Sequence, residues 1–164
     1  MMTKFFLGIA IVAFTTFCGA VLAKKYRQRK LFFKQLKEFN ERFLNEISYY
    51  RRPLGVFSQK YSYTGEFKEV LYGFLSIMDK SIITSDTLHL SVYTFLQKDD
   101  RIFIEDYFKM LGKGDSASQK TYFNSIKEPL TKLQTESEAT CKKYGDLYIK
   151  IGFLCGLLIL ILIL

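Results

Sequence analysis

Two apolar runs lie at the ends of the chain, and the segment between them has the patterning of amphipathic helices. Residues 5–23 and 151–164 contain no Asp, Glu, Lys or Arg. A helix over the first run would span about 28 Å, close to the roughly 30 Å hydrocarbon core of a bilayer. Residues 147–150 extend the second run to about 27 Å if Lys150 carries its charge back to the interface. Both runs therefore predict transmembrane helices.

Each run also has an alternative interpretation. The Val-Leu-Ala sequence at 21–23 resembles a signal-peptide cleavage site, but the run is longer than a usual signal core and five basic residues follow it within 24–30. A lipoprotein at Cys18 is disfavoured because bulky Phe17 precedes it. A buried core helix at the second run would need a larger domain to cover its apolar surface. The predicted domains are an anchor at 1–23, a helical domain at 24–146 and an anchor at 147–164.

The middle of the chain holds apolar residues at helical spacing. Between Lys30 and Arg52 they form one stripe, which predicts a helix that continues from the first anchor and is ended by Pro53. A second helix begins at Thr64-Gly65 and has the clearest periodicity in the chain. The stripe residues are Phe32, Leu36, Phe39, Phe43, Ile47 and Tyr50 in the first helix, and Phe67, Val70, Leu71, Phe74, Leu75 and Met78 in the second.

Two further helices follow towards the second anchor. Asp99 and Asp100 supply N-cap chemistry for one helix, and the Gly-Lys-Gly sequence at 112–114 ends it. Asp115 caps the last helix, which runs into the second anchor and is kinked at Pro129, because proline has no N–H for the carbonyl four residues before it. Their stripes are Phe103, Tyr107, Phe108 and Leu111, then Tyr122, Phe123, Ile126, Leu130 and Leu133.

Residues 81–98 fit two patterns. Leu88, Leu90 and Val92 alternate as in a strand, whereas Leu88 and Val92 also share a helix face with Phe95. Because a single strand would have no partner, we expect a helix here. The predicted fold class is therefore all-α, a helical bundle whose long first and last helices are continuous with the transmembrane helices.

Composition is compatible with one such domain between the anchors. Sixteen Phe and eleven Tyr supply large apolar areas for a core. Cys18 and Cys155 fall in the predicted anchors, and Cys141 is alone between them. We therefore expect no disulfide inside the domain.

The excess of positive charge is concentrated after the first anchor. The formal net charge is +8; residues 24–63 hold 11 Lys/Arg against 3 Asp/Glu, whereas residues 64–150 hold 12 against 13. Basic residues beside an anchor favour the cytoplasmic side and anionic lipid headgroups, so we expect residues 24–30 to bind headgroups and disfavour nucleic acid. Arg51 and Arg52 lie about 40 Å further along a straight helix, beyond a Debye length of roughly 8 Å, so a protein partner or a solvated surface explains them better.

No residue pattern predicts catalysis, a cofactor or a small-molecule substrate. His89 is the single histidine and the cysteines are far apart, so no metal site has recognisable ligand spacing. Gly112-x-Gly114 lacks the Gly-Lys-Ser/Thr ending of a phosphate-binding loop. Cys141 has lysines beside it but no base nearby in the sequence. We therefore expect a protein that is not an enzyme.

Three short pieces of sequence, in register over the whole chain, carry a family resemblance. They are Glu46-Ile47-x-Tyr49-x-x-x-Pro53-Leu54, Leu111-Gly112-x-x-Asp115-x-x-x-Gln119 and Leu147-Tyr148-x-x-Ile151-Gly152-Phe153-Leu154-x-Gly156-Leu157-Leu158. Together they resemble the stage III sporulation protein AB family, bitopic membrane proteins of endospore-forming bacteria.

The resemblance implies a helical domain similar to the cytoplasmic domains of general secretion pathway protein F, the inner-membrane platform of type II secretion and type IV pilus machines. It also implies a place in the mother-cell-to-forespore channel, in the mother-cell membrane that engulfs the forespore, beside the cytosolic ATPase called stage III sporulation protein AA. In this picture Glu46, Tyr49 and Pro53 fix one helix corner, and Asp115 and Gln119 fix the opposite one. Capping and packing explain these five residues better than direct contact with a partner.

Three hypotheses follow. The first is a non-enzymatic platform or adaptor that couples the ATPase to the membrane complex, with Arg51 and Arg52 as candidate partner contacts. The second is a membrane-remodelling or hole-forming protein, in which Gly152-x-x-x-Gly156 lets anchors of different copies associate. The third is a dimeric scaffold of the division type, and a homo-oligomer is compatible with all three.

Overall fold

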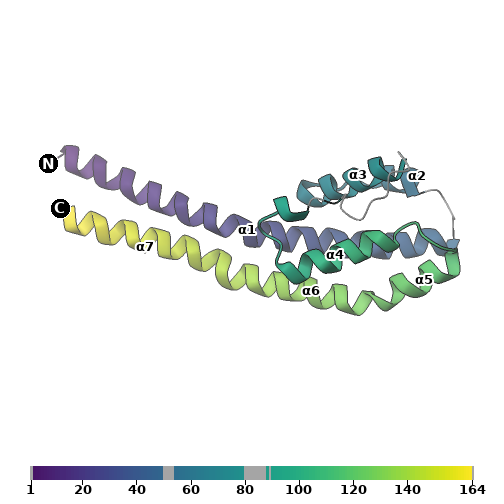
Figure 1. Cartoon of the computed structure of the whole chain (residues 1–164). Coiled ribbons are helices and arrows are strands. Elements are labelled where there is room, and N and C mark those ends of the chain that lie inside the picture. Colours follow the sequence, from purple (N-terminus) through teal and green to yellow (C-terminus); the bar gives the residue numbers. More distant parts are fainter. Residues whose placement is uncertain (1, 50–53, 80–87, 89, 164) are drawn as a thin grey trace. The chain divides into compact units, whose positions relative to one another are not determined.

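In the part of the chain that the computed structural model describes, helices joined by short turns and loops make up the protein and no strand occurs, which confirms the predicted all-α fold class (Figure 1). The chain divides into two compact units: unit 1 is Met1–Lys30 with Glu136–Leu164, and unit 2 is Leu31–Thr135. Both crossings between the units lie inside helices, namely α1 (Met2–Tyr49) and α6 (Lys127–Thr140). The described residues are 2–49, 54–79, 88 and 90–163.

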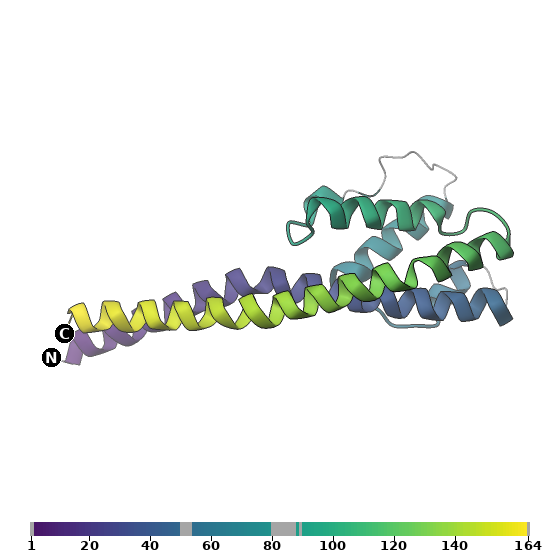
Figure 2. The ribbon, with the colours of Figure 1, turned by 90° about the horizontal axis from the view of Figure 1, so that it is seen from below.

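Unit 1 is a pair of antiparallel helical segments. The first part of α1 lies beside the end of α6, the π-helical segment η2 (Cys141–Gly145) and α7 (Asp146–Ile163), and the N- and C-terminal turns lie together (Figure 2). Both helices are long and apolar enough to cross a membrane, judged by length and composition. Phe14 is 67% exposed and Leu158 is 63% exposed. This exposure argues against the alternative of a buried core helix.

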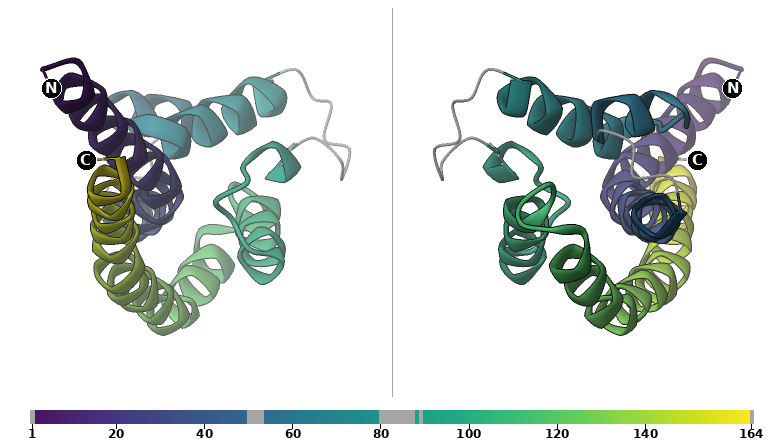
Figure 3. Two further views of the ribbon diagram at one scale, coloured as in Figure 1. Left: turned by 90° about the vertical axis from the view of Figure 1, so that its left-hand side faces the viewer. Right: turned by 90° about the vertical axis from the view of Figure 1, so that its right-hand side faces the viewer.

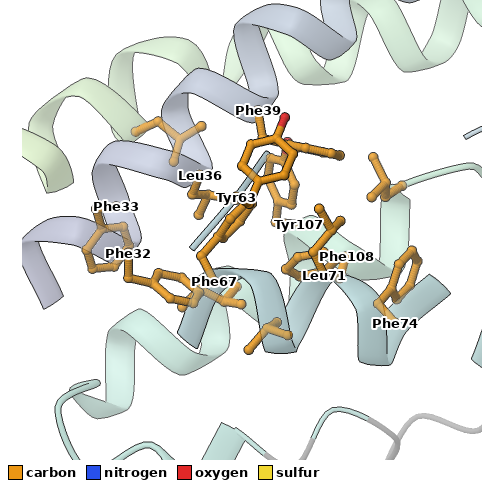
Figure 4. Packing of buried hydrophobic residues seen from close by; sticks show 14 of the residues in the cluster. Phe32, Phe33, Leu36, Phe39, Tyr63, Phe67, Leu71, Phe74, Tyr107 and Phe108 are labelled. Atoms are coloured by element: carbon orange, nitrogen blue, oxygen red, sulfur yellow. The ribbon is translucent and has the colours of Figure 1, made fainter. Parts of the chain in front are cut away.

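Unit 2 encloses an aromatic core. In the end-on views, α3 (Gly65–Asp79), α4 (Lys98–Met110) and α5 (Ser116–Ser125) lie around the second half of α1 (Figure 3). Phe39 of α1 is fully buried, and its ring contacts rings from other parts of the unit, with centroids 5.6 to 6.4 Å apart (Figure 4). These rings belong to Phe57, Tyr63, Phe67 and Tyr107. Such aromatic pairs add packing energy beyond the area that they bury.

The described residues of the predicted apolar stripes face this core, and Tyr50, at the end of the first stripe, lies outside the described part of the chain. The stripe of α3 is buried or packed against the cluster over its full length, as expected for an amphipathic helix with one covered face. In α1 the covered face is wider than the predicted stripe, because Phe33, Gln35, Asn40 and Leu44 are buried as well. The second half of α1 is therefore covered on more than one side.

The helix predicted over residues 81–98 is wrong for its described part. Leu90–Val92 form only a short 3-10 helix, η1, and the chain then runs to Gln97 without a helix. Helix α4 begins at Lys98 because the Asp100 carboxylate accepts a hydrogen bond of 3.0 Å from the backbone N–H of Gln97, which has an extended conformation. Gln97, rather than Asp99 or Asp100, is thus the N-cap residue. Residues 80–87 and 89 lie outside the described ranges.

The last predicted helix consists of several segments. Pro129 offers no N–H to the carbonyl of Ser125, and the helix is interrupted at Ile126, between α5 and α6. A kink was expected at Pro129, and the structure instead has a break in the helix at Ile126, three residues earlier. The π-helical segment η2 separates α6 from α7 and has no counterpart in the prediction.

Candidate interaction surfaces

The first piece of family sequence lies where α1 ends and the short helix α2 (Leu54–Gln59) begins. Glu46 is buried, and Ile47 and Leu54 pack against the core of unit 2. These positions fit a packing role for the corner. The following residues of the corner lie outside the described part of the chain, or have side chains outside it: Tyr49, Arg51, Arg52 and Pro53.

The second piece forms the turn between α4 and α5. Leu111 is buried, and Gly112 has a φ of 78°, a left-handed conformation that glycine adopts without strain. A Cβ at Gly112 would lie 2.9 Å from Cε of Met78 and 3.9 Å from Cδ2 of Leu54. The turn at Gly112 therefore lies beside Leu54, with Met78 in contact with it. The corner after α1 and the corner between α4 and α5, expected to be opposite each other, are neighbours in unit 2.

Asp115 has the predicted capping role. Its side chain accepts a 2.9 Å hydrogen bond from the backbone N–H of Ser118, and Gln119 donates its backbone N–H to the Asp115 carbonyl at 3.0 Å. Hydrogen bonds from the side chain and the backbone of Ser118 lower the pKa of Asp115. The cap is thus strongest when Asp115 is ionised.

An open groove of about 390 Å³ lies between α2 and α3, beside these corners. Leu54, Leu75 and Met78 line it, and Tyr72 at its side is 40% exposed. The hydroxyl of Ser76, also in the lining, donates to the carbonyl of Gly73 within its own helix at 2.7 Å. The groove is accordingly apolar in character, and its lining offers no Asp, Glu, Lys, Arg or His within the described residues.

The small-residue pattern of α7 packs against α1 of the same chain. A Cβ at Gly152 would lie 2.6 Å from the Thr15 carbonyl oxygen and 3.3 Å from Cα of Gly19. A Cβ at Gly156 would lie 2.8 Å from Cα of Val12 and would also meet the Thr15 hydroxyl. Such distances mean that the two backbones touch, so the face expected to join different copies is occupied inside unit 1.

The basic stretch that follows the apolar run of α1 divides into two groups. Lys24, Lys25 and Arg27 are exposed. Arg29 is only 4% exposed and lies 3.9 Å from a Glu136 carboxylate oxygen, and Lys30 pairs with Glu138 at 3.3 Å. All three residues of the first group have the exposure expected of residues that bind lipid headgroups, whereas Arg29 is buried. The paired group holds α1 against α6.

Three tyrosine rings stack at the same place in unit 1. The ring of Tyr26 lies 5.7 Å from that of Tyr144 and 5.8 Å from that of Tyr148, at interplanar angles of 26° and 17°. Nζ of Lys25 lies 5.0 Å from the Tyr26 ring centroid, and Nζ of Lys143 lies 5.1 Å from the Tyr144 centroid. Tyrosine rings with amphipathic character are typical of the membrane–water interface.

Unit 2 also contains a buried polar network that the sequence did not indicate. Nδ2 of Asn40 donates to the Phe123 carbonyl at 3.2 Å, and Oδ1 of Asn40 accepts from the Tyr107 hydroxyl at 3.3 Å. Burial raises the pKa of Tyr107 well above its ordinary value, so the hydroxyl remains a donor. In the sequence, the position of Asn40 beside an apolar stripe was the one indication of this network. It did not indicate which residues Asn40 would bond to.

Histidine, cysteine and the acidic residues are the candidate metal ligands of the chain. Within the described ranges, no three His, Cys, Asp or Glu side chains gather as potential metal ligands. Cys141 is half-buried in η2, and a Cβ at Gly145 would lie 3.7 Å from its Sγ. His89 lies outside the described residues.

Comparisons with known proteins agree with the resemblance found in the sequence. A family model described as Stage III sporulation protein AB matches residues 4–164. No curated protein matches the chain, and no solved structure does so either. The family is a structural or channel component of sporulation and is not a known enzyme family. Since the match covers nearly the whole chain, the protein belongs to the stage III sporulation protein AB family and has a role in stage III sporulation.

Proposed function

We propose that this protein is a non-enzymatic membrane platform of the mother-cell-to-forespore channel, and that it couples the cytosolic ATPase stage III sporulation protein AA to the membrane complex. One observation carries the proposal: a helical unit with its own aromatic core is inserted between two helices apolar enough to cross a membrane. A domain tethered at both of its ends is suited to receive force from a soluble motor and to pass it to the bilayer.

The connections between the units support such coupling. The chain passes from unit 1 to unit 2 inside α1, and it returns inside α6. Helical connections are stiffer than Gly/Ser-rich linkers, which behave as flexible coils and would dissipate a displacement. We propose that general secretion pathway protein F works in a comparable way and is the appropriate functional analogue.

In the proposed topology both terminal helices span the mother-cell membrane around the forespore, and unit 2 lies in the cytoplasm. The exposed basic residues Lys24, Lys25 and Arg27 support this orientation, because positive charges beside a span are retained on the cytoplasmic side. Protease treatment after selective rupture of the outer mother-cell membrane tests it, because the cytoplasmic face of the membrane around the forespore is then accessible. Protection of unit 2 from digestion under these conditions would refute the topology and, with it, the contact with a cytosolic ATPase.

The alternative of a hole-forming protein has less support. It relies on association of the C-terminal helices through Gly152 and Gly156, and both glycines already pack against Thr15 in the same chain. Reconstitution of the purified chain into dye-loaded vesicles separates the alternatives. Dye release by the chain alone would favour hole formation, and intact vesicles would favour the platform.

Co-purification is the direct test of the adaptor role. The full chain, extracted from sporulating cells in a mild detergent, should retain the ATPase, and the R51E/R52E double variant should lose it. The matched control is K120E/K132E, which reverses two charges at exposed positions of unit 2. Failure of the wild-type chain to retain the ATPase would refute the adaptor role. Equal loss in both double variants would remove Arg51 and Arg52 as the specific contact.

A further inference from the structure

The pairing of helices in unit 1 brings together two basic stretches that are more than a hundred residues apart in sequence. The Tyr26 ring stacks on the Tyr144 ring at 5.7 Å, and Lys30 pairs with Glu138 at 3.3 Å. In an antiparallel pair with these contacts, Lys142 and Lys143 lie at the level of residues 24–27. Both lysines are exposed. In the sequence they stand out only as the neighbours of Cys141.

We propose that Lys142 and Lys143, together with Lys24, Lys25 and Arg27, form a basic collar on two helices that binds the phosphate of anionic phospholipid headgroups. This inference rests on the membrane topology proposed above. It extends the expected headgroup contact from one helix to two and adds residues of the C-terminal segment.

The acidic residues nearby leave the collar positively charged. Glu136 lies against Arg29 and Glu138 against Lys30, so two carboxylates already face basic residues outside the collar. Asp146 is exposed on α7, towards its apolar part. Five basic side chains and one carboxylate give the collar a net positive charge, which attracts a phosphate group. The attraction extends about one Debye length from the surface.

The tyrosine stack positions two of the ammonium groups. Lys25 lies over the ring of Tyr26 and Lys143 over the ring of Tyr144, while the two rings stack on each other. One lysine from each helix therefore lies beside a common group of rings. Tyrosines at this level are also typical of the headgroup layer, which gives an observation independent of the charges.

The backbone at the collar is unusual. Lys142 and Lys143 both belong to the π-helical segment η2, which includes one buried glycine, Gly145. Single π-helical turns are rare inside helices and occur frequently at functional sites. The segment lies directly before α7, whose apolar residues begin at Leu147. The collar is therefore located where a spanning helix would leave the hydrocarbon layer.

Native mass spectrometry of the full chain in a mild detergent tests the proposal. The chain is titrated with phosphatidylglycerol and with phosphatidylcholine of the same acyl chains. Wild type should prefer phosphatidylglycerol, and K142Q/K143Q should weaken that binding by about fivefold for each lysine removed, as K24Q/K25Q should. K142R/K143R should retain the preference, because it keeps both charges. K120Q/K132Q in unit 2 is the control for a general loss of charge.

Several outcomes would overturn the inference. One is unchanged phosphatidylglycerol binding in K142Q/K143Q; another is equal loss in K142R/K143R, which would indicate a structural defect. Equal binding of soluble glycerol phosphate would show a site for free phosphate instead of a lipid. A chain that prefers phosphatidylglycerol but does not retain the ATPase refutes the adaptor role and leaves the collar standing.

Discussion

Replacement of Asn40 should destabilise unit 2 more than any surface substitution in the same helix. Asn40 is only 1% exposed and joins three helices, because it bonds to the Tyr107 hydroxyl of α4 and to the Phe123 carbonyl of α5. Carbonyls in the last turn of a helix have no partner within the helix, so Asn40 of α1 caps the end of α5.

The magnitude follows from the groups that Asn40→Ala leaves behind. A typical buried hydrogen bond contributes about 1 kcal/mol net, and a buried group that loses its partner costs about 1–3 kcal/mol. With a hydroxyl and a carbonyl both affected, we expect a loss of about 2–4 kcal/mol. That is a large share of the roughly 5–15 kcal/mol by which a domain is stable.

The assay is urea unfolding of the full chain in a mild detergent, followed by the near-ultraviolet circular dichroism of its tyrosines. Asn45→Ala is the matched control, since Asn45 is on the same helix and exposed, and it should change stability by no more than about 0.5 kcal/mol. In a double-mutant cycle, the variant that carries both Asn40→Ala and Tyr107→Phe should lose about 1 kcal/mol less stability than the sum of the losses in the two single variants.

Two results would refute this reasoning. The first is a cycle with Tyr107→Phe that shows no coupling, because Asn40→Ala would then act through lost volume alone. Equal stability of Asn40→Ala and Asn45→Ala would show that the buried network contributes nothing measurable.

Three further predictions concern glycines and a cap. Gly156→Leu should lower the melting temperature of the helix pair, measured by far-ultraviolet circular dichroism in detergent, because backbone fills the space; Cys155→Leu, on an exposed position, should not. Gly112→Ala should cost about 1 kcal/mol or more in urea unfolding, given its positive φ and the contact that a Cβ would make, whereas Gly55→Ala has open space around it and should be nearly neutral. Asp115 has a lowered pKa, so its stabilising effect is present above the unfolded pKa of about 3.9 and is lost as pH falls below it. Urea unfolding at several pH values should therefore show a steeper acid loss for wild type than for Asp115→Asn.

Periodicity predicted most of the helices because burial of one face is a local property of the sequence. The stripe from Phe67 to Met78 became α3, and the glycines at 112 and 114 ended α4, both with positive φ. The prediction over residues 81–98 was wrong in its described part because a capping interaction, between Gln97 and Asp100, set the helix start. A capping interaction of this kind determines where a helix begins, and the spacing of apolar residues does not indicate it.

The candidate surfaces depended on pairing between distant segments and were less accessible to prediction. The sequence identified the basic residues 24–30, but it did not show that Arg29 and Lys30 face Glu136 and Glu138. Nor did it place Lys142 and Lys143 at that level, since this follows from the register of two helices. The partners of Asn40 are likewise defined by tertiary contact.

The contact between α1 and α7 has a consequence for transport. Along Gly19, Gly152 and Gly156 the two backbones approach so closely that a single methyl group would collide with the opposite helix. Because the two backbones are in van der Waals contact there, no gap is left for a water molecule or a solute, and this stretch of the pair encloses no permeation path. Any lumen in an apparatus built with this chain must be lined by the outward faces of several such pairs or by other subunits.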